Sequence, residues 1–400
     1  MDINTKIFLR KKFKEYYWKN SKKIKAPIEI EKREFGIGTL DKKIKARHKS
    51  FSTEIEMQNY LKREAPFFIS YSAAYYEFPS NEPMSSKNWL GADLVFDLDM
   101  EMPLLNKEKL QKVKKEIINL RDFLLNDFGF SQQEIEINFS GSQGYHIHVI
   151  SKKIKNLGSD ERREILDYIS GNINLNEFWY PESNIIRGPK KEEYGWRGRI
   201  WNELYNFLKN SNINELKKTP GIGEKKAKII INNRDKILDD LKKGIYNSLA
   251  DVGVITFDTV DVSRKVSDDP NVSVKVIKRI RSKVLQKIIK AKAISVSAST
   301  DVDKMVTIDT SRLMRLPDSL HGGSGLIAKK VLDIDKFNPL IDAIAFKEKE
   351  EITIKLNRSI EKFDFINEEK VGPFKEGIAR VSTPLAIYLI LKGFGNFLKF

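Results

Sequence analysis

The segment Leu94-Val95-Phe96-Asp97-Leu98-Asp99 decides how the rest of the chain is interpreted. Its apolar residues predict a short buried strand that ends in two aspartates. Residues i and i+2 of a strand point to the same face of the sheet, so Asp97 and Asp99 are expected side by side. Divalent cations relieve the repulsion between such carboxylates and can hold the oxygens of a phosphoryl transfer, and carboxylate oxygens suit Mg²⁺ or Mn²⁺. We therefore predict a catalytic metal site here; the alternative is a solvated strand end with chance acidic spacing.

A tight turn, Ser140-Gly141-Ser142-Gln143-Gly144, joins two further strands that we expect at 134–139 and 145–150. Two of the four histidines of the chain, His146 and His148, follow the turn and share one face of the second strand. Their rings can bind a metal, donate to a phosphate or pack within the sheet. The chain has no cysteine, which excludes disulfides and thiolate zinc sites.

A third cluster runs from Asp309 to Gly322, after a short apolar strand that we expect at 305–308. It contains two arginines and a histidine that we single out: Arg312, Arg315 and His321. The planar fork of arginine matches the geometry of phosphate oxygens. Asp309 would add a third carboxylate for a metal, and the cations after it would bind the phosphates of a triphosphate. The alternative is a surface loop whose arginines pair with nearby acids.

The middle of the chain changes character. Residues 196–293 are rich in Lys and Asn and mostly helical in pattern, so we expect an all-helical insertion into a main domain made of 1–195 and 294–400. Within the insertion, residues 219–227 look like the hairpin of a helix-hairpin-helix motif, where glycines let a helix N-terminus approach DNA phosphates. The DNA contacts expected from it are Gly221, Gly223, Lys225 and Lys226. An ordinary helical corner is the alternative.

The charge of the chain indicates a polyanionic partner. Lys and Arg number 71 against 55 Asp and Glu, a formal net charge of +16, and such an excess attracts polyanions. Nucleic acid is the first candidate, and an acidic membrane surface is the second. The membrane interpretation is weakened because the sequence has no run of about 18 apolar residues and no apolar stretch of signal-peptide type near residue 1. We expect a cytoplasmic protein associated with the nucleoid.

Taken together, the motifs resemble those of the small catalytic subunit of archaeal and eukaryotic replicative primases, and they occur in the same order. The matching segments are Arg33-Glu34-Phe35-Gly36 through Arg47-His48, Leu94 to Asp99, Phe139 to His146, and Asp309 to Gly322. They span most of the chain. The resemblance implies an α+β fold, with a catalytic core of two mixed β-sheets flanked by helices and with the inserted all-helical subdomain.

The resemblance also implies a role for each matching residue. Asp97, Asp99 and Asp309 would hold the catalytic metals, Mg²⁺ or Mn²⁺. Ser140, His146, Arg315 and His321 would contact the triphosphate of the incoming nucleotide, and Glu34 and Arg47 would contact a nucleotide's sugar or phosphate. The implied activity is that of a DNA-directed nucleotidyltransferase, which synthesises short RNA or DNA primers from NTPs or dNTPs on single-stranded DNA during replication. The implied protein partner is a large primase subunit, in a heterodimer.

Two features depart from the family pattern. Many members carry a zinc-binding Cys/His segment after the paired aspartates, but Met100 to Asn106 has no such ligand, so we expect no zinc. An arginine is usual where this chain has Gln143, and losing one charge-assisted contact costs about 1.5–3 kcal/mol. Lys152 and Lys153 are candidates to replace that charge. Two alternatives stay open: a primase-like polymerase of repair, end joining or a mobile element, and a catalytically weak nucleic-acid-binding subunit.

Overall fold

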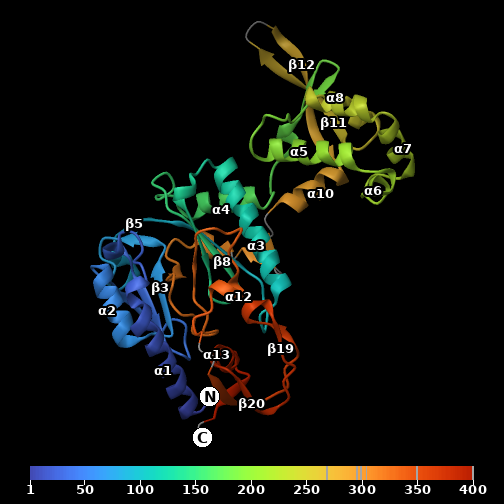
Figure 1. Ribbon diagram of the computed structural model, residues 1–400. Coiled ribbons are helices and arrows are strands. Elements are labelled where there is room, and N and C mark those ends of the chain that lie inside the picture. Colours follow the sequence, from blue (N-terminus) through green and yellow to red (C-terminus); the bar gives the residue numbers. More distant parts are fainter. Residues whose placement is uncertain (267–268, 294–295, 298–299, 303, 348–349, 399–400) are drawn as a thin grey trace. The chain divides into compact units, whose positions relative to one another are not determined.

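The structure is a computed structural model that describes residues 1–266, 269–293, 296–297, 300–302, 304–347 and 350–398. The chain divides into two compact units (Figure 1). The first consists of Met1–Arg121, Phe130–Leu166 and Ser295–Phe400, and the second of Asp122–Gly129 and Asp167–Ile294. The second unit is therefore larger than the insertion at 196–293 that the sequence led us to expect.

Side-chain contacts within the second unit explain its larger extent. Arg199, on helix α5 (Gly195–Asn210), binds the carboxylate of Asp127, with 2.8 Å between Nη2 and Oδ1. The indole of Trp196, on the same helix, donates a hydrogen bond to the carbonyl of Tyr168 at 2.7 Å. These contacts attach segments before residue 196 to the helices that follow it.

A six-stranded sheet carries the paired aspartates in the first unit. Its strands, in spatial order, are β13 (Val296–Ser297), β14 (Thr300–Val302), β6 (Leu94–Asp99), β8 (Gly144–Val149), β7 (Ile135–Phe139) and β16 (Lys330–Val331). Neighbouring strands run antiparallel throughout, so the expectation of a mixed sheet was wrong. The turn at 140–143 is one reason, because so short a connection joins only antiparallel neighbours.

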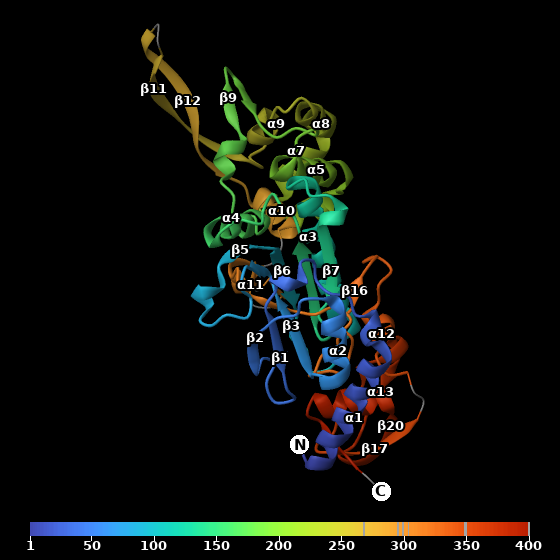
Figure 2. The same cartoon turned by 90° about the vertical axis from the view of Figure 1, so that its left-hand side faces the viewer.

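A four-stranded antiparallel sheet lies next to the first one in the chain's first unit (Figure 2). Its strands, in spatial order, are β15 (Leu313–Arg315), β3 (Phe68–Ser72), β1 (Phe35–Gly38) and β2 (Ala46–Lys49). The ring of Tyr71 on β3 stacks on that of His148 on β8, with 5.8 Å between centroids. Buried apolar side chains from both sides, including Val95 and Met314, share one core cluster. The two sheets therefore meet through a common core.

Helices flank these sheets, and the α+β class is confirmed. Those that lie wholly or mostly in the first unit are α1 (Ile3–Asn20), α2 (Glu54–Glu64), α3 (Lys107–Asp122), α4 (Ser159–Ile169), α11 (Lys304–Ile308), α12 (Pro339–Asp342) and α13 (Thr383–Leu391). The strand expected at 305–308 was wrong, because this segment is the short helix α11, continued by a hydrogen bond from the amide of Asp309 to the carbonyl of Met305. None of the helices in the described part of the chain is long and apolar enough to cross a membrane.

Three small antiparallel sheets complete the first unit. One is the hairpin of β4 (Ala74–Tyr76) and β5 (Trp89–Ala92), directly before the strand with the paired aspartates. The second contains β20 (Gly377–Ser382), β17 (Glu351–Leu356) and β21 (Gly395–Phe397), with α13 following β20. The third pairs β18 (Phe363–Asp364) with β19 (Lys370–Val371). The ring of Phe397 stacks on that of Phe8, at 4.4 Å between centroids, which attaches the end of the chain to α1 (Figure 2).

The second unit is not all helical, which corrects the sequence-based expectation. Besides α5 it contains α6 (Ile213–Lys217), α7 (Glu224–Asn232), α8 (Arg234–Lys242), α9 (Asn247–Asp251) and α10 (Lys283–Lys292). It also has a hairpin of β9 (Tyr180–Glu182) and β10 (Ile185–Arg187), and a long hairpin of β11 (Thr256–Val266) and β12 (Asp269–Arg281). The frequent Val, Ile and Thr of 256–281 favour extended strands over helix, and this local preference was overlooked.

Candidate active site

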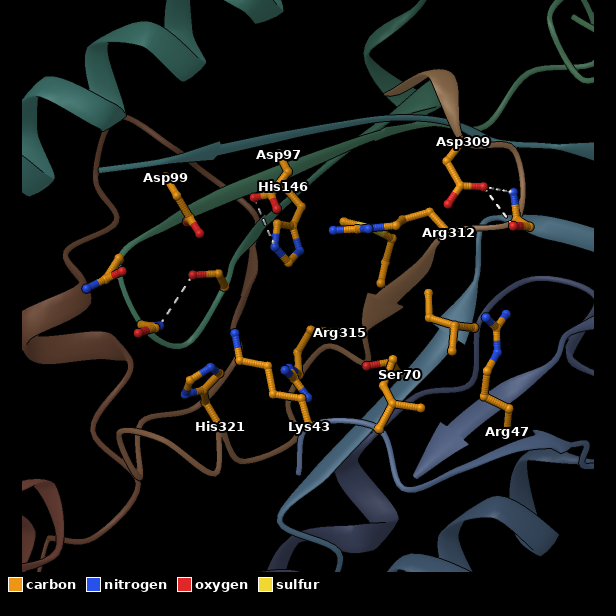
Figure 3. A pocket seen from close by; sticks show the side chains of 17 residues that line it. Lys43, Arg47, Ser70, Asp97, Asp99, His146, Asp309, Arg312, Arg315 and His321 are labelled. Atoms are coloured by element: carbon orange, nitrogen blue, oxygen red, sulfur yellow. Dashed lines mark hydrogen bonds and ion pairs between the residues drawn. The ribbon is translucent and has the colours of Figure 1, made fainter. Parts of the chain in front are cut away.

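One cavity of about 360 Å³ in the first unit gathers most of the residues that the sequence singled out. Its walls come from both large sheets and from the segment after α11 (Figure 3). The lining residues with charged or polar side chains are Lys43, Arg47, Ser70, Asp97, Asp99, Ser140, Ser142, Gln143, His146, Asp309, Ser311, Arg312, Arg315 and His321.

The paired aspartates stand at the end of β6, against strand β8. Asp97 lies opposite His146 in the sheet register, with 3.4 Å between its Oδ1 and the ring Nε2. Burial lowers the pKa of His146 to about 4, so the ring is neutral near pH 7. Asp99 lies opposite Gly144, where an added Cβ would come within 2.1 Å of the Asp99 carboxylate. Only glycine therefore fits at this position, and the turn lies directly against the acidic strand end.

Hydrogen bonds hold the turn at 140–143 in one shape. The hydroxyl of Ser140 accepts from the amides of Ser142 and Gly144, at 3.3 and 3.2 Å. Gly141 has φ +82°, in the left-handed region, and a Cβ there would lie 2.8 Å from that of His321. The side-chain amide of Gln143 donates from Nε2 to the backbone carbonyl of Met102, so this side chain points toward the segment after β6. The turn thus offers hydroxyl and amide groups but no cation.

Asp309 lines the same cavity from another element. It follows α11, and its Oδ1 accepts from the amide and the hydroxyl of Ser311, at 2.8 and 2.7 Å. In Figure 3 its carboxylate lies on the opposite side of the cavity from that of Asp99. Within the described ranges, no three acidic or histidine side chains are placed closely enough to hold one metal ion together. The three carboxylates share a cavity, but they do not form one preassembled cluster.

Arg315 supplies buried positive charge to this cavity. Its Nε and Nη1 are buried and have no hydrogen-bond partner among the residues that the structure describes. Its guanidinium lies 4.8 Å from the centroid of the Phe68 ring. Burial lowers the pKa of Arg315 to about 10, which leaves it charged near pH 7. A buried cation with open donors is suited to an anion.

His321 lies beside this cation. Burial, followed by the charge of Arg315, lowers its pKa well below the usual value of a histidine. Its Nδ1 lies within 3.3 Å of the amide of Gly323, which is placed to donate to it. A neutral ring that accepts at Nδ1 carries its proton on Nε2, where it can donate to a phosphate oxygen.

Glu34 and Arg47 have different positions with respect to the cavity. Arg47 lines it, whereas the Glu34 side chain is completely buried behind Arg47. The carboxylate of Glu34 accepts from Arg47 Nε at 2.8 Å, from Arg47 Nη2 at 3.2 Å and from the amide of His48. We expected both residues to touch a nucleotide, but the structure places only Arg47 where it can do so.

The sequence did not single out Lys43, Ser70 or Ser142 for a role in the cavity. Lys43 lies between two strands, in a stretch with several other lysines, and nothing local distinguishes it from them. Lys152 and Lys153, our candidates to replace a charge at Gln143, are not among the residues that line the cavity.

In the second unit, the hairpin at 219–227 joins α6 to α7. Gly221 has φ +89°, a conformation that favours glycine, and Gly223 precedes the first residue of α7. Lys225 is exposed, whereas the ammonium of Lys226 donates to the carbonyl of Gly253 at 2.6 Å. Lys226 therefore has a local structural partner, and contact with DNA remains a prediction for this hairpin.

The chain combines an α+β fold with a cavity lined by acidic and basic side chains, and its sequence matches that of a known protein family. The family model described as DNA primase small subunit matches residues 96–333, which is more than half of the chain, and the chain belongs to this family.

Its relatives carry a more particular name, DNA primase small subunit PriS. The protein of that name from Methanococcoides burtonii is 34% identical, over 98% of each chain. The one from Methanosarcina acetivorans is 34% identical, over 99% of this chain and 98% of its own. The one from Archaeoglobus fulgidus is 32% identical, over 97% and 98%.

Proposed function

We propose that this chain is the catalytic small subunit of a DNA primase, which joins nucleotides on a single-stranded DNA template during replication. The observation that carries this proposal is the cavity of the first unit, where Asp97 and Asp99 lie against the glycine turn (Ser140 to Gly144) and share the space with Arg315. The family membership and the names of the relatives support the same activity.

The donor set at the strand end fits Mg²⁺ or Mn²⁺. Carboxylate oxygens are the ligands that these ions prefer, and Mg²⁺ usually keeps several waters and takes only one or two carboxylates from a protein. Asp97, Asp99 and Asp309 would hold the metal, and Ser311 would orient the Asp309 carboxylate through the hydrogen bonds to its Oδ1. When bound, the metal would activate the attacking hydroxyl and neutralise charge on the phosphates.

The other residues of the cavity would bind and orient the incoming nucleotide. Arg315 offers two unused donors to phosphate oxygens, and His321 offers a neutral N–H. The turn with Ser140 would contact the triphosphate from its other side. Arg47 would bind the sugar or a phosphate at the far end of the cavity. Positioning and charge neutralisation would supply most of the catalysis, because phosphoryl transfer needs little covalent chemistry from the protein.

Binding to the template would be electrostatic, because the net charge of the chain is +16. A large primase subunit would be the protein partner, since replicative primases work as heterodimers. This proposal places the protein in the cytoplasm, at the nucleoid.

Synthesis on a single-stranded DNA template tests the proposal directly. The chain, alone and with its large subunit, would be supplied with NTPs or dNTPs and with Mg²⁺ or Mn²⁺. We expect new strands from both preparations and initiation without a primer from at least the complex. Template binding without any incorporation would instead support the catalytically weak subunit, for which Gln143 is the specific observation. Extension of primers without any initiation would support the repair-type polymerase.

A further inference from the structure

Lys43 is carried by the loop at 39–45, between β1 and β2, and it lines the active-site cavity. Hydrogen bonds fix the loop on both sides of Lys43. The backbone amide of Thr39 donates to the carbonyl of Lys42 at 2.9 Å, and the backbone amide of Lys45 donates to the carbonyl of Ile37 at 2.8 Å. A Cβ at Gly38 would lie 2.1 Å from the carbonyl oxygen of Lys43. The backbone of Lys43 is thus packed directly on β1, and its position does not depend on a flexible tip.

In Figure 3 the side chain of Lys43 lies between those of Arg315 and His321. Its ammonium forms no hydrogen bond or ion pair with any residue in the described part of the chain. Burial lowers the pKa of His321 most, and the charges of Arg315, Lys43 and Lys392 lower it further, in that order. In Figure 3 Asp97, Asp99 and Asp309 are all drawn above Lys43, Arg315 and His321, with Asp309 at the other end of the cavity from Asp99. Two cations and a neutral histidine therefore face the same space without an acid among them.

The glycine turn cannot neutralise a triphosphate by itself. From Ser140 to Gly144 it contains no basic residue, and its longest side chain, Gln143, is engaged with Met102. A nucleotide triphosphate is a polyanion, so basic side chains elsewhere in the cavity would neutralise the charge that the metal leaves unbalanced. The basic residues that line the cavity are Lys43, Arg47, Arg312 and Arg315, and of these Arg315 and Lys43 lie beside His321.

We propose that Lys43 binds the terminal phosphates of the incoming nucleotide together with Arg315 and His321, and that it supplies the positive charge that the glycine turn lacks. This inference rests on the proposed function and adds to it a residue that binds substrate. The ammonium of Lys43 would move from solvent to the phosphates when the nucleotide enters, and Lys43 would keep the leaving pyrophosphate in place during the reaction.

The test compares three variants of the full chain in template-dependent synthesis. Lys43→Ala removes the charge, Lys43→Arg keeps it, and Lys42→Ala is the matched control, because Lys42 is an exposed neighbour in the same loop that does not line the cavity. We expect Lys43→Ala to raise KM for the nucleotide about tenfold, as for the loss of one charge-assisted contact, with kcat much less affected. Lys43→Arg should keep most of the affinity, and Lys42→Ala should resemble the unaltered chain.

Inorganic tripolyphosphate gives a second measurement that does not depend on turnover by the variant. Tripolyphosphate competes with a fluorescent nucleotide for the site, and the competition measures its affinity. In Lys43→Ala this affinity should fall by the same factor as KM rises. The affinity for DNA should stay unchanged. If Lys43→Ala behaves like Lys42→Ala in both measurements, the inference is overturned. A loss of DNA affinity with unchanged KM would overturn it too, because Lys43 would then belong to the template path. If the unaltered chain with its large subunit incorporates no nucleotide, the proposed function fails, whatever these variants show.

Discussion

Glu34 holds the guanidinium of Arg47 with both of its carboxylate oxygens, at 2.8 and 3.2 Å, from a position with no exposure to solvent. The same carboxylate accepts from the amide of His48 and lies 3.9 Å from the ammonium of Lys87. Its oxygens are therefore occupied, and reaching a nucleotide would require releasing Arg47. The arrangement indicates that Glu34 acts through Arg47 by fixing its direction.

This relationship predicts that Glu34 and Arg47 behave as one unit. Glu34→Gln keeps the size of the side chain but removes its charge, so it should raise KM for the nucleotide much as Arg47→Ala does. The double variant should be no worse than Arg47→Ala alone, because the two changes remove the same interaction. Glu34→Gln should also lower the free energy of unfolding by about 1–3 kcal/mol, since buried Lys87 loses a charged neighbour. Additive effects on KM would show that Glu34 has a contact of its own.

Asp97→Asn should abolish nucleotide incorporation while the chain stays folded, because a neutral amide oxygen binds a divalent cation much more weakly than a carboxylate does. Mn²⁺ binding, measured by calorimetry, should be lost with it. Asp309→Asn should also abolish synthesis but keep part of the Mn²⁺ affinity, since Asp309 is hydrogen-bonded to Ser311 and does not belong to a preformed cluster. Near-normal synthesis by Asp97→Asn would contradict the metal assignment, and equal loss of Mn²⁺ by both variants would contradict the distinction between them.

Gln143→Arg should tighten nucleotide binding, because it adds a cation to a turn that has none. High salt should reduce the gain if it is electrostatic. The same change should partly restore a Lys43→Ala chain, since both residues would serve the phosphates from opposite walls. KM measured at two salt concentrations for the single and double variants checks this. Loss of all synthesis by a folded Gln143→Arg chain would mean that the turn does not cradle the triphosphate, and the roles of Ser140 and His146 would then be withdrawn.

The two lysines of the hairpin at 219–227 should respond differently to charge reversal. Lys225→Glu should weaken binding to single-stranded DNA and reduce the salt dependence of binding by about one phosphate contact, without changing nucleotide affinity. Lys226→Glu should chiefly destabilise the second unit, because Lys226 donates to the carbonyl of Gly253. Salt titrations of DNA binding and thermal unfolding separate the two effects. Unchanged DNA binding by Lys225→Glu would leave the hairpin as a structural corner.

Stability should fall with pH on the acid side, and His148 should account for part of that fall. The ring is fully buried against Tyr71, and burial lowers its pKa to about 3. An unfolded histidine titrates near 6.5, so below that pH the unfolded chain binds the extra proton. The free energy of unfolding should then drop by about 1.4 kcal/mol per pH unit for this group. Urea unfolding at pH 7 and pH 5 should show a smaller drop for His148→Phe, and equal drops would contradict the prediction.

The local parts of the site were predictable from the sequence, because short-range geometry decides them. The spacing of Asp97 and Asp99 predicted that both side chains lie on one face of a strand, and the glycines predicted the turn at 140–143. The cations of 309–322 also line the cavity that the motifs suggested. In each case the residue types allow only a few backbone conformations, so the pattern leads directly to the structure.

The features that we missed depend on contacts between distant parts of the chain. Lys43 is one of several similar lysines, and only the pairing of β1 with β3, and of β3 with β15, brings it near Arg315. The role of Glu34 behind Arg47 depends on burial that no local pattern reports. The hairpin of β11 and β12 was overlooked for another reason, because its preference for strand was outweighed by the helical surroundings.

The strand with the paired aspartates acquires its outer neighbour only after three quarters of the sequence has been synthesised. Strand β14 pairs with β6, placing Asp301 opposite Asp99, and Asp309 follows a few residues later. The ribosome has by then released the whole second unit. A chain that stops before β14 would leave the edge of β6 open, and open edges pair with other chains. Truncated chains should therefore aggregate and have no partial activity. Premature termination would then give a product that is degraded and does not act as an unregulated polymerase.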